Sequence, residues 1–209
     1  MGTRRRLSVE DRRDELLQAC LDLIGTRPWD EVSMADVAEA AGASKPLLYH
    51  YFATKRDLYL ATVAAAAEEL REATRPNPSL PLAERMRAAL DAHLDWIDAH
   101  ALAYRAILQG GVSSEPRVHA IVEQSRTEVV ARLAETFALD HLTPGQRIAF
   151  RGWIGFLESA GLEWLTTRAV TKDELAALLT ASVLALPETI DRAQTLSSIR
   201  IADDEAAAS

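Results

Sequence analysis

Five side chains around residue 50 can carry positive charge or donate hydrogen bonds, and they lie within eleven residues of one another. They are Lys45, Tyr49, His50, Tyr51 and Lys55. Cations and hydroxyl or ring N–H donors are the groups that bind DNA phosphates and the edges of bases. A helix that enters the major groove can present such groups to both. The cluster therefore predicts binding to double-stranded DNA rather than catalysis.

Turn and cap signals around this cluster predict two short helices. Ser33 and Asp36 have the spacing of a capping box at the start of the first helix. Gly42 stands where that helix must end, because glycine tolerates the left-handed conformation of such a stop. Ser44 can cap the second helix, with Pro46 in the first turn, where the missing amide breaks no hydrogen bond. The order of helix, tight turn and helix is that of a helix-turn-helix.

Apolar residues in the same segment predict the side that packs inward. Val37 and Ala40 give the first helix a short apolar face. Leu48 and Phe52, four residues apart, do the same for the second helix. The hydrogen-bonding side chains of the second helix then face away from the core.

The segment resembles the DNA-binding domain of the TetR family of bacterial transcriptional regulators. The matching residues are Val37, Ala38, Ala41, Gly42, Ser44, Leu48, Tyr49, Phe52, Lys55 and Leu58. An upstream amphipathic helix that ends at Gly25, followed by the loop anchors Trp29 and Val32, fits the same domain. The resemblance covers about residues 8–62 and is weak beyond them. Ala35 departs from the pattern, because many relatives carry a basic residue there.

The resemblance and the position of each residue on its helix predict the DNA contacts. The predicted residues are Ser33, Ser44, Lys45, Leu47, Tyr49, His50, Tyr51 and Lys55. Residues near the N-terminal end of such a helix contact base edges, so Lys45 and Leu47 are expected to read sequence. The others are expected to contact the DNA backbone or to support those that do.

Charge is distributed unevenly along the chain, which bears on DNA as a partner. The chain has 23 Lys and Arg and 31 Asp and Glu, a net charge of −8. Residues 1–56 hold nine basic and nine acidic residues, so the excess acid lies in residues 57–209. Arg4, Arg5 and Arg6 form either a solvated tail or a basic arm on the duplex. Local potential, and not net charge, governs the approach to phosphates.

Composition favours a helical globular protein. Hydrophobic residues make up 48% of the 209 residues, with 9 Gly and 8 Pro. No apolar stretch reaches the length of a membrane span, and the first residues lack the hydrophobic region of a secretory leader. The single cysteine, Cys20, excludes an internal disulfide and is expected to be a buried packing residue. We therefore expect a cytoplasmic, nucleoid-associated protein.

Helical periodicity and turn signals predict an all-α chain of about nine helices. The predicted divisions are a DNA-binding domain at 1–53 with a basic arm at 1–8, a linking helix at 54–75, a ligand-binding and dimerisation domain at 76–197, and a frayed tail at 198–209. The later helices are expected at about 82–99, 100–109, 114–139, 143–168 and 171–186. Pro187 is expected to end the last helix.

The expected helices at 143–168 and 171–186 are candidates for dimerisation, because the first mixes glycine with large apolar residues. Glycine inside a helix costs about 1 kcal/mol against alanine, which close packing against another helix can offset. The resemblance implies that both helices pair with symmetry mates, and a two-fold dimer suits a near-palindromic DNA site. Packing within one chain is the alternative for Leu157 and Leu165. The predicted interface residues are Leu157, Gly161, Trp164, Leu165, Leu178 and Ser182.

Polar and aromatic side chains in otherwise apolar helices predict a small-molecule site in the same domain. They are His93, Trp96, His100, Tyr104, Gln109, Trp153, Phe156 and Glu158. Core packing is the alternative for each aromatic residue. Their apolar character favours an uncharged or amphipathic effector. We expect no cofactor and no metal, since no histidine pair has ligand spacing with supporting Cys or Glu.

Catalysis and simple packing are the rival interpretations. The sequence has no glycine-rich phosphate loop, nucleophile elbow or His-Glu-x-x-His motif, so we expect no enzyme. An all-helical interaction protein would have to pair the polar groups of Tyr49, His50 and Tyr51 internally. The favoured function is a homodimeric regulator, most simply a repressor, that binds a palindromic operator and is released by a small-molecule effector.

Overall fold

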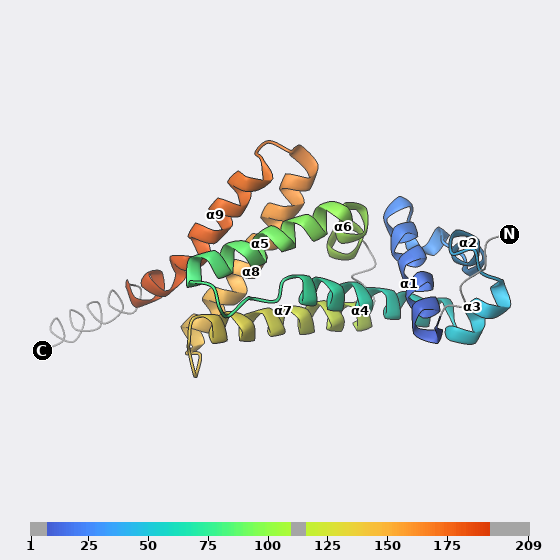
Figure 1. Ribbon diagram of the computed structural model, residues 1–209, viewed down its shortest axis with the longest axis horizontal. Coiled ribbons are helices and arrows are strands. Elements are labelled where there is room, and N and C mark those ends of the chain that lie inside the picture. Colours follow the sequence, from blue (N-terminus) through green and yellow to red (C-terminus); the bar gives the residue numbers. More distant parts are fainter. Residues whose placement is uncertain (1–7, 110–115, 193–209) are drawn as a thin grey trace, which may run out of the picture. The chain divides into compact units, whose positions relative to one another are not determined.

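The computed structural model describes residues 8–109 and 116–192, which form helices and no strand (Figure 1). The elements are α1 (Val9–Thr26), η1 (Trp29–Glu31, a 3-10 turn), α2 (Met34–Ala40), α3 (Lys45–Tyr51), α4 (Lys55–Ala73), α5 (Leu82–Ala99), α6 (Ala101–Gln109), α7 (Pro116–Thr136), α8 (Pro144–Thr167) and α9 (Lys172–Leu184). The predicted all-α class and the order of the helices are confirmed. The predicted arm at Arg4–Arg6 and the predicted tail at 198–209 lie outside the described residues.

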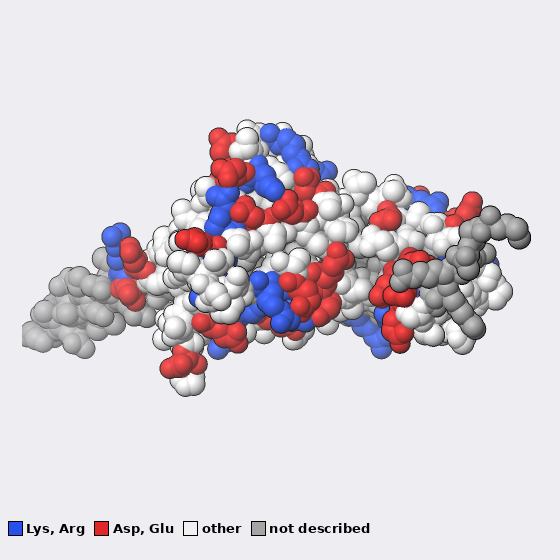
Figure 2. Space-filling view, in the orientation of Figure 1, with Lys and Arg blue, Asp and Glu red and all other residues white. Residues whose placement is uncertain are grey.

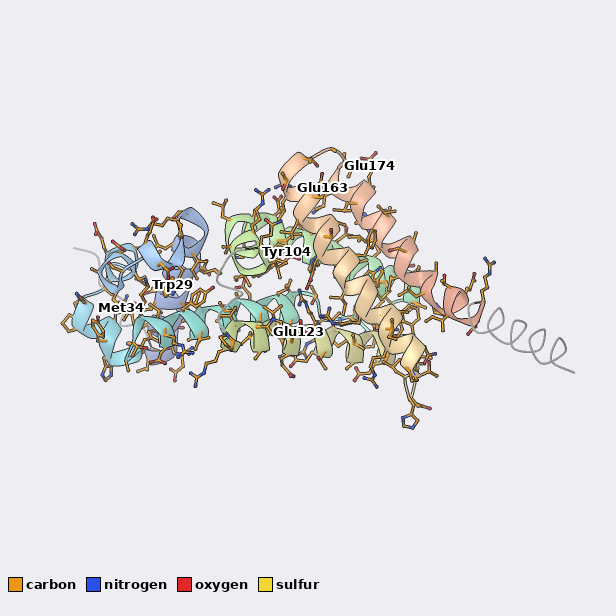
Figure 3. The ribbon with its side chains drawn as sticks, turned by 180° about the vertical axis from the view of Figure 1, so that it is seen from behind. Trp29, Met34, Tyr104, Glu123, Glu163 and Glu174 are labelled. Carbon is orange, nitrogen blue, oxygen red and sulfur yellow. The ribbon has the colours of Figure 1, made fainter. Side chains whose placement is uncertain are left out.

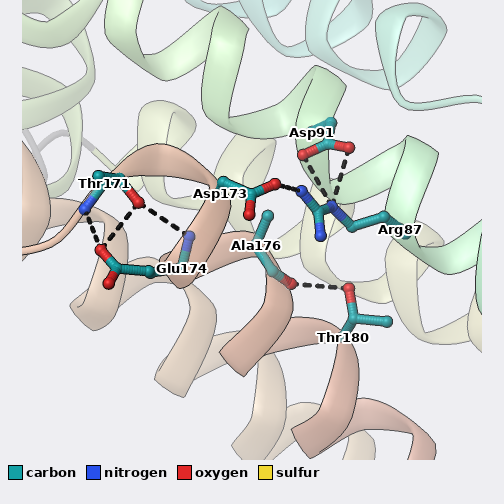
Figure 4. Close-up of polar contacts among 7 residues, drawn as sticks. All are labelled: Arg87, Asp91, Thr171, Asp173, Glu174, Ala176 and Thr180. Carbon is teal, nitrogen blue, oxygen red and sulfur yellow. Dashed lines mark hydrogen bonds and ion pairs between the residues drawn. The ribbon is translucent and has the colours of Figure 1, made fainter.

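Side-chain caps explain why the starts of several helices could be predicted. The Ser33 hydroxyl accepts the N–H of Asp36 at 3.2 Å, and the Asp36 carboxylate accepts the N–H of Ser33 at 2.7 Å. That second hydrogen bond is the main reason that the pKa of Asp36 lies below its usual range. Thr171 and Glu174 form the same reciprocal pair at the start of α9 (Figure 4). The predicted capping box at Ser33 and Asp36 is therefore confirmed.

Gly25 lies in the last turn of α1, which ends at Thr26, one residue after the predicted end. A Cβ placed on Gly25 would stand 2.4 Å from the Cβ of Leu102 and 3.0 Å from the backbone nitrogen of Ala103. The glycine is required because α1 and α6 approach each other closely at this point, and not because the helix turns left-handed.

Two local expectations are wrong. Ala40 is exposed, and the buried face of α2 consists of Met34, Val37 and Ala38, which are three and four residues apart. Pro187 does not end the last helix, because α9 already ends at Leu184 and residues 186–192 are helical again. Proline is compatible with a first helical turn, where its missing N–H has no partner to lose.

The chain divides into two compact units. Unit 1 comprises Met1–Ala73 and Asp95–Ser125, and unit 2 comprises Thr74–Leu94 and Arg126–Ser209. The predicted ligand-binding domain at 76–197 includes helix α6, which in the structure packs within unit 1. The physical reason is the close packing of α6 on α1 at Gly25.

The core of unit 1 joins the short helices α2 and α3 to the long helices α1 and α4. Val37 and Leu48 are fully buried, together with Leu16 and Leu58 from the two long helices. Cys20 is buried in the same core, as predicted. Burial raises the pKa of its thiol to about 11, so the side chain stays neutral.

Unit 2 combines apolar packing with polar links between helices, among them a link between α5 and α9. Phe150 is fully buried, and Phe137 stacks on it with the ring centroids 5.8 Å apart. Arg87 of α5 pairs with Asp91 on the same helix at 2.9 Å and with Asp173 in the first turn of α9 (Figure 4). The start of α9 is therefore tied to α5 in addition to its own capping box.

Replacing Gly25 by alanine should destabilise the protein by about 1–3 kcal/mol, because the added methyl group meets atoms of α6 that cannot move without the backbone. Urea unfolding followed by circular dichroism measures the change. Gly145→Ala is the matched control, since its added Cβ meets only the Thr143 hydroxyl at 4.0 Å. Equal stability of the two variants would show that α1 and α6 are not in close contact.

Candidate nucleic-acid interface

The turn between α2 and α3 depends on Gly42, whose φ of +57° lies in the left-handed region. Beyond it, the N–H of Ala43 donates to the carbonyl oxygen of Ala38 at 2.8 Å, the hydrogen bond of a Schellman stop. Ser44 then caps α3, its hydroxyl accepting the N–H of Leu47 at 3.3 Å. The predicted turn is confirmed, and it sets the direction in which α3 leaves α2.

The outward face of α3 carries most of the side chains predicted to contact DNA. Lys45, Tyr49 and His50 are exposed, with Tyr49 at 45%. Leu47 is half-buried, and Leu48 on the opposite face is fully buried. The helix thus presents a lysine at its N-terminal end and two hydrogen-bonding rings one turn later.

Two of the predicted contacts also hold local structure. The Ser33 hydroxyl is the cap of α2, described above. Tyr51 is half-buried against the core of unit 1, with its ring centroid 5.6 Å from that of His50 and 6.4 Å from that of Phe52. Tyr51 therefore links the exposed rings of α3 to the core beneath them.

Lys55, in the first turn of α4, is held against η1. Its Nζ donates to the carbonyl oxygen of Asp30 at 3.1 Å and lies 4.7 Å from the ring centroid of Trp29. Trp29, which Figure 3 labels, stacks on Tyr59 with 4.5 Å between the centroids. An ammonium group has three donors, so Lys55 keeps donors for a phosphate while the carbonyl and the ring set its position.

Intramolecular partners separate the basic side chains of residues 8–73 into two kinds. Arg12 pairs with Glu15 at 2.6 Å, and Arg27 pairs with Asp36 at 2.9 Å. Within the described residues, three other cations have no carboxylate partner: Arg13, Lys45 and Lys55. Basic and acidic side chains are interspersed on the face drawn in Figure 2, and no broad field of one sign forms there.

Comparison with known proteins identifies the family. Residues 16–62 match the sequence model of the bacterial regulatory proteins of the tetR family, and residues 82–186 match that of the tetracyclin repressor-like C-terminal domain. The chain belongs to the TetR family. The resemblance predicted from the helix-turn-helix residues is thereby confirmed, and it extends over the second part of the chain.

Individual relatives agree with this. The TetR-family chain is 34% identical over 126 residues to the transcriptional activator FasR of Mycolicibacterium smegmatis, and the match covers 58% of each protein. A regulator from Streptomyces coelicolor superimposes with a TM-score of 0.79 at 30% identity, over 88% of this chain and 83% of that one. FadR of Bacillus subtilis, solved with stearoyl-CoA, has the same fold at 14% identity, with a TM-score of 0.62 over 83% of this chain and 96% of its own. All three proteins are named as transcriptional regulators.

The residues predicted to bind an effector divide between the two units of this TetR-family chain. In unit 1, Trp96 and Tyr104 are buried, and His100 stacks on Trp96 with 4.4 Å between the ring centroids. His100 Nδ1 also lies 3.0 Å from the backbone oxygen of Trp96. Gln109, at the end of α6, is exposed. The structure thus brings Trp96 and His100 together and leaves Gln109 in solvent.

In unit 2, two of the predicted effector residues have partners within the chain. The Glu158 carboxylate accepts two hydrogen bonds from the Arg126 guanidinium, at 2.8 and 2.6 Å. Trp153 donates its indole N–H to the Ser182 hydroxyl at 2.9 Å. Phe156 is 41% exposed on α8. His93 is buried on α5.

The predicted dimer residues lie mostly inside unit 2. Those that are buried there are Leu157, Gly161, Trp164 and Leu165. Ser182 is half-buried and bonded to Trp153. Leu178, by contrast, is 55% exposed on α9 and is accessible to a partner.

The described residues hold no arrangement typical of a metal site or of a membrane-spanning helix. No group of three or more histidine, cysteine or carboxylate side chains is arranged there to bind a metal ion. No helix among them combines the length and the apolar character that a membrane crossing requires.

Sequence reasoning missed the interactions that join distant positions. The pair between Arg27 and Asp36 and the pair between Arg126 and Glu158 link different elements, so helical spacing contains no sign of either. Trp29 was recognised as an apolar loop anchor, but its role as a support for Lys55 was not.

His93 should make the protein more sensitive to acid. Burial lowers its pKa from 6.5 to about 4, so between these values the unfolded chain binds more protons than the folded one. The contribution of neutral His93 to the free energy of unfolding is fully present above about pH 6.5. It is lost as the pH falls toward 4, by about 3 kcal/mol in all. We expect His93→Gln to show a correspondingly smaller loss of stability on acidification, measured by urea unfolding at about pH 7 and pH 4.5.

His119→Gln is the control, because His119 is exposed on α7. The His119→Gln variant should show the same pH dependence of the free energy of unfolding as the wild type. An unchanged pH dependence in the His93→Gln variant would contradict a buried, neutral His93.

Proposed function

We propose that this TetR-family regulator is a homodimer whose two α3 helices bind the half-sites of a palindromic operator, and that a small effector weakens this binding. The observation that carries the proposal is the outward face of α3, where Lys45, Tyr49 and His50 are exposed above a buried Leu48. A capped helix with such a face suits the major groove. Operator binding would place the protein on the nucleoid.

The position of each side chain supports a division of roles. Lys45 and Leu47 lie in the first turn of α3 and are proposed to contact base edges. Ser44 caps that turn and orients it. The proposed backbone contacts are Ser33, Tyr49, His50, Tyr51 and Lys55.

Repression is the simplest outcome of operator binding, because a dimer seated on a promoter blocks polymerase. Activation is the second candidate, since the relative FasR is named as a transcriptional activator. A reporter gene placed behind the selected operator distinguishes the two by the sign of the change when this chain is co-expressed.

An open apolar face on α8 supports the dimer. Ile148, Gly152, Gly155, Phe156 and Ser159 are exposed at spacings of three and four residues, so they form one stripe. A Cβ placed on either glycine would meet nothing within 4 Å in the chain itself.

Three exposed apolar residues of α9 are proposed to extend this face. They are Ala177, Leu178 and Ala181. A second copy packed across α8 and α9 would use the close approach that the glycines permit. We therefore propose that this stripe, rather than the buried Leu157 and Trp164, makes the central contacts of the dimer.

The effector is proposed to be an uncharged or amphipathic molecule that contacts α5 and α6 within unit 1. Trp96, His100 and Tyr104 supply two buried rings and one half-buried ring there. Such aromatic surroundings favour an apolar body with few polar groups. Stearoyl-CoA, which FadR of Bacillus subtilis binds, is a suitable first probe.

Contacts inside unit 1 offer a route from the effector to DNA. α6 packs on α1 at Gly25, and α1 packs in turn on α2 and α4. An effector that binds one arrangement of α6 more tightly would shift the population of α1 to α4 that is competent for DNA. We propose that α4, which lies wholly within this unit, transmits the effector-induced change to α3.

Selection from a pool of random duplexes tests the proposal. The full chain should enrich a palindrome, and Lys45→Ala should relax base preference at one position of each half-site by about 1–3 kcal/mol. Lys172→Ala is the matched control, because Lys172 also stands at the first position of a helix, α9, in unit 2. Enrichment of no palindrome would refute operator binding, and an unchanged preference in the Lys45→Ala variant would refute its contact with bases.

Gly155→Arg should separate the dimer into monomers, because it buries an unpaired guanidinium in each half of the interface, at a cost of several kcal/mol. Light scattering at micromolar concentration should give a mass near 22.9 kDa for the variant and about twice that for the wild type. Val9→Arg adds the same charge to an exposed apolar residue of α1 and should remain dimeric. A dimeric Gly155→Arg variant would place the interface elsewhere.

A further inference from the structure

Arg13 of α1 contacts the C-terminal end of α3 through an aromatic ring. Its Cζ lies 5.5 Å from the ring centroid of Phe52. Phe52 is the C-cap of α3, and its N–H donates to the carbonyl oxygen of Leu48 at 2.9 Å. The Phe52 ring is itself 4% exposed and belongs to the core of unit 1. The guanidinium of an exposed residue is thereby held beside a fixed point of α3.

The neighbouring Arg12 has a carboxylate partner, and Arg13 has none in the described part of the chain. Arg12 donates to the Glu15 carboxylate at 2.6 Å, so its charge is neutralised within α1. In the described part of the chain, the only interaction of Arg13 is with the Phe52 ring. A ring face attracts the cation without accepting its N–H groups in the manner of a carboxylate. The five N–H donors of Arg13 therefore stay available to an outside acceptor.

The same arrangement recurs at Lys55, which is held over the Trp29 ring at 4.7 Å. Both rings belong to residues that flank the helix-turn-helix formed by α2 and α3: η1 precedes α2, and Phe52 follows α3. Contact with an aromatic ring already restricts the conformations of a long cationic side chain, so less conformational entropy is lost when it binds a phosphate. The contact leaves the positive charge intact. Arg13 and Lys55 are thus held over aromatic rings and not against carboxylates.

We propose that Arg13 is an additional DNA contact, binding a phosphodiester of the operator backbone beside the C-terminal end of α3, with Phe52 as its positioning residue. The guanidinium fork matches the geometry of a phosphate and can bind it through two hydrogen bonds. Such a contact positions the protein without reading sequence. The proposal rests on the proposed function, since it requires that α3 bind duplex DNA.

The test compares three variants of the full chain on the palindrome selected by the wild type and on an unrelated duplex. Affinity is measured by fluorescence anisotropy over a series of salt concentrations. Arg13→Ala should weaken binding to both duplexes and lower the slope of log K against log salt by about 1.8, since each protomer of the dimer loses one phosphate contact. Arg13→Lys keeps the charge and should retain most of the slope.

Arg12→Ala is the matched control, because it removes the same charge from the adjacent residue. It should leave the slope near that of the wild type, since Arg12 is already paired. Thermal unfolding of each variant separates binding from folding: a purely structural Arg13 would lower the melting temperature without changing the slope. Equal slopes for Arg13→Ala and the wild type would overturn the proposal. Absence of any DNA binding by the wild type would instead refute the proposed function.

Discussion

Helices α2 and α3 have seven residues each, a length at which a helix is not stable alone in water. Their positions therefore depend on the core of unit 1, where Val37 and Leu48 are fully buried with Leu16 and Leu58. Caps and the Gly42 turn set the local direction, but packing on α1 and α4 supplies most of the stability. The position and orientation of the polar face of α3 consequently depend on the whole unit.

Around that face, the partner of each cation decides what it can do. A carboxylate neutralises Arg12 and another neutralises Arg27, whereas Lys55 rests on an aromatic ring and a carbonyl. A ring restrains the side chain and leaves its charge available, which is what a contact with phosphate needs. The acidic net charge of the chain is compatible with DNA binding for this reason, since the local arrangement governs the interaction.

Glycine illustrates how one residue type serves three different purposes in this chain. Gly42 adopts a left-handed conformation in the turn between α2 and α3. Gly25 permits α6 to approach α1, while Gly152 and Gly155 open onto space on α8. The first purpose could be predicted, because a turn is a local feature flanked by cap residues. The second could not be predicted, since the sequence around Gly25 gives no sign of what packs against it.

Local and periodic signals by themselves determined that the chain is all helical, where its helix-turn-helix lies, and which face of α3 is polar. These features depend on interactions between residues three or four positions apart, which a sequence displays directly.

Only the tertiary structure decided that residues 95–125 belong with the DNA-binding helices, and that Arg126 neutralises Glu158. It alone also decided that Arg13 lies over Phe52 while Arg12 is paired. The Arg126–Glu158 pair and the Arg13–Phe52 contact each join elements far apart along the chain. The packing of those elements sets which side chains meet, and the spacing of residues in the sequence does not reveal it.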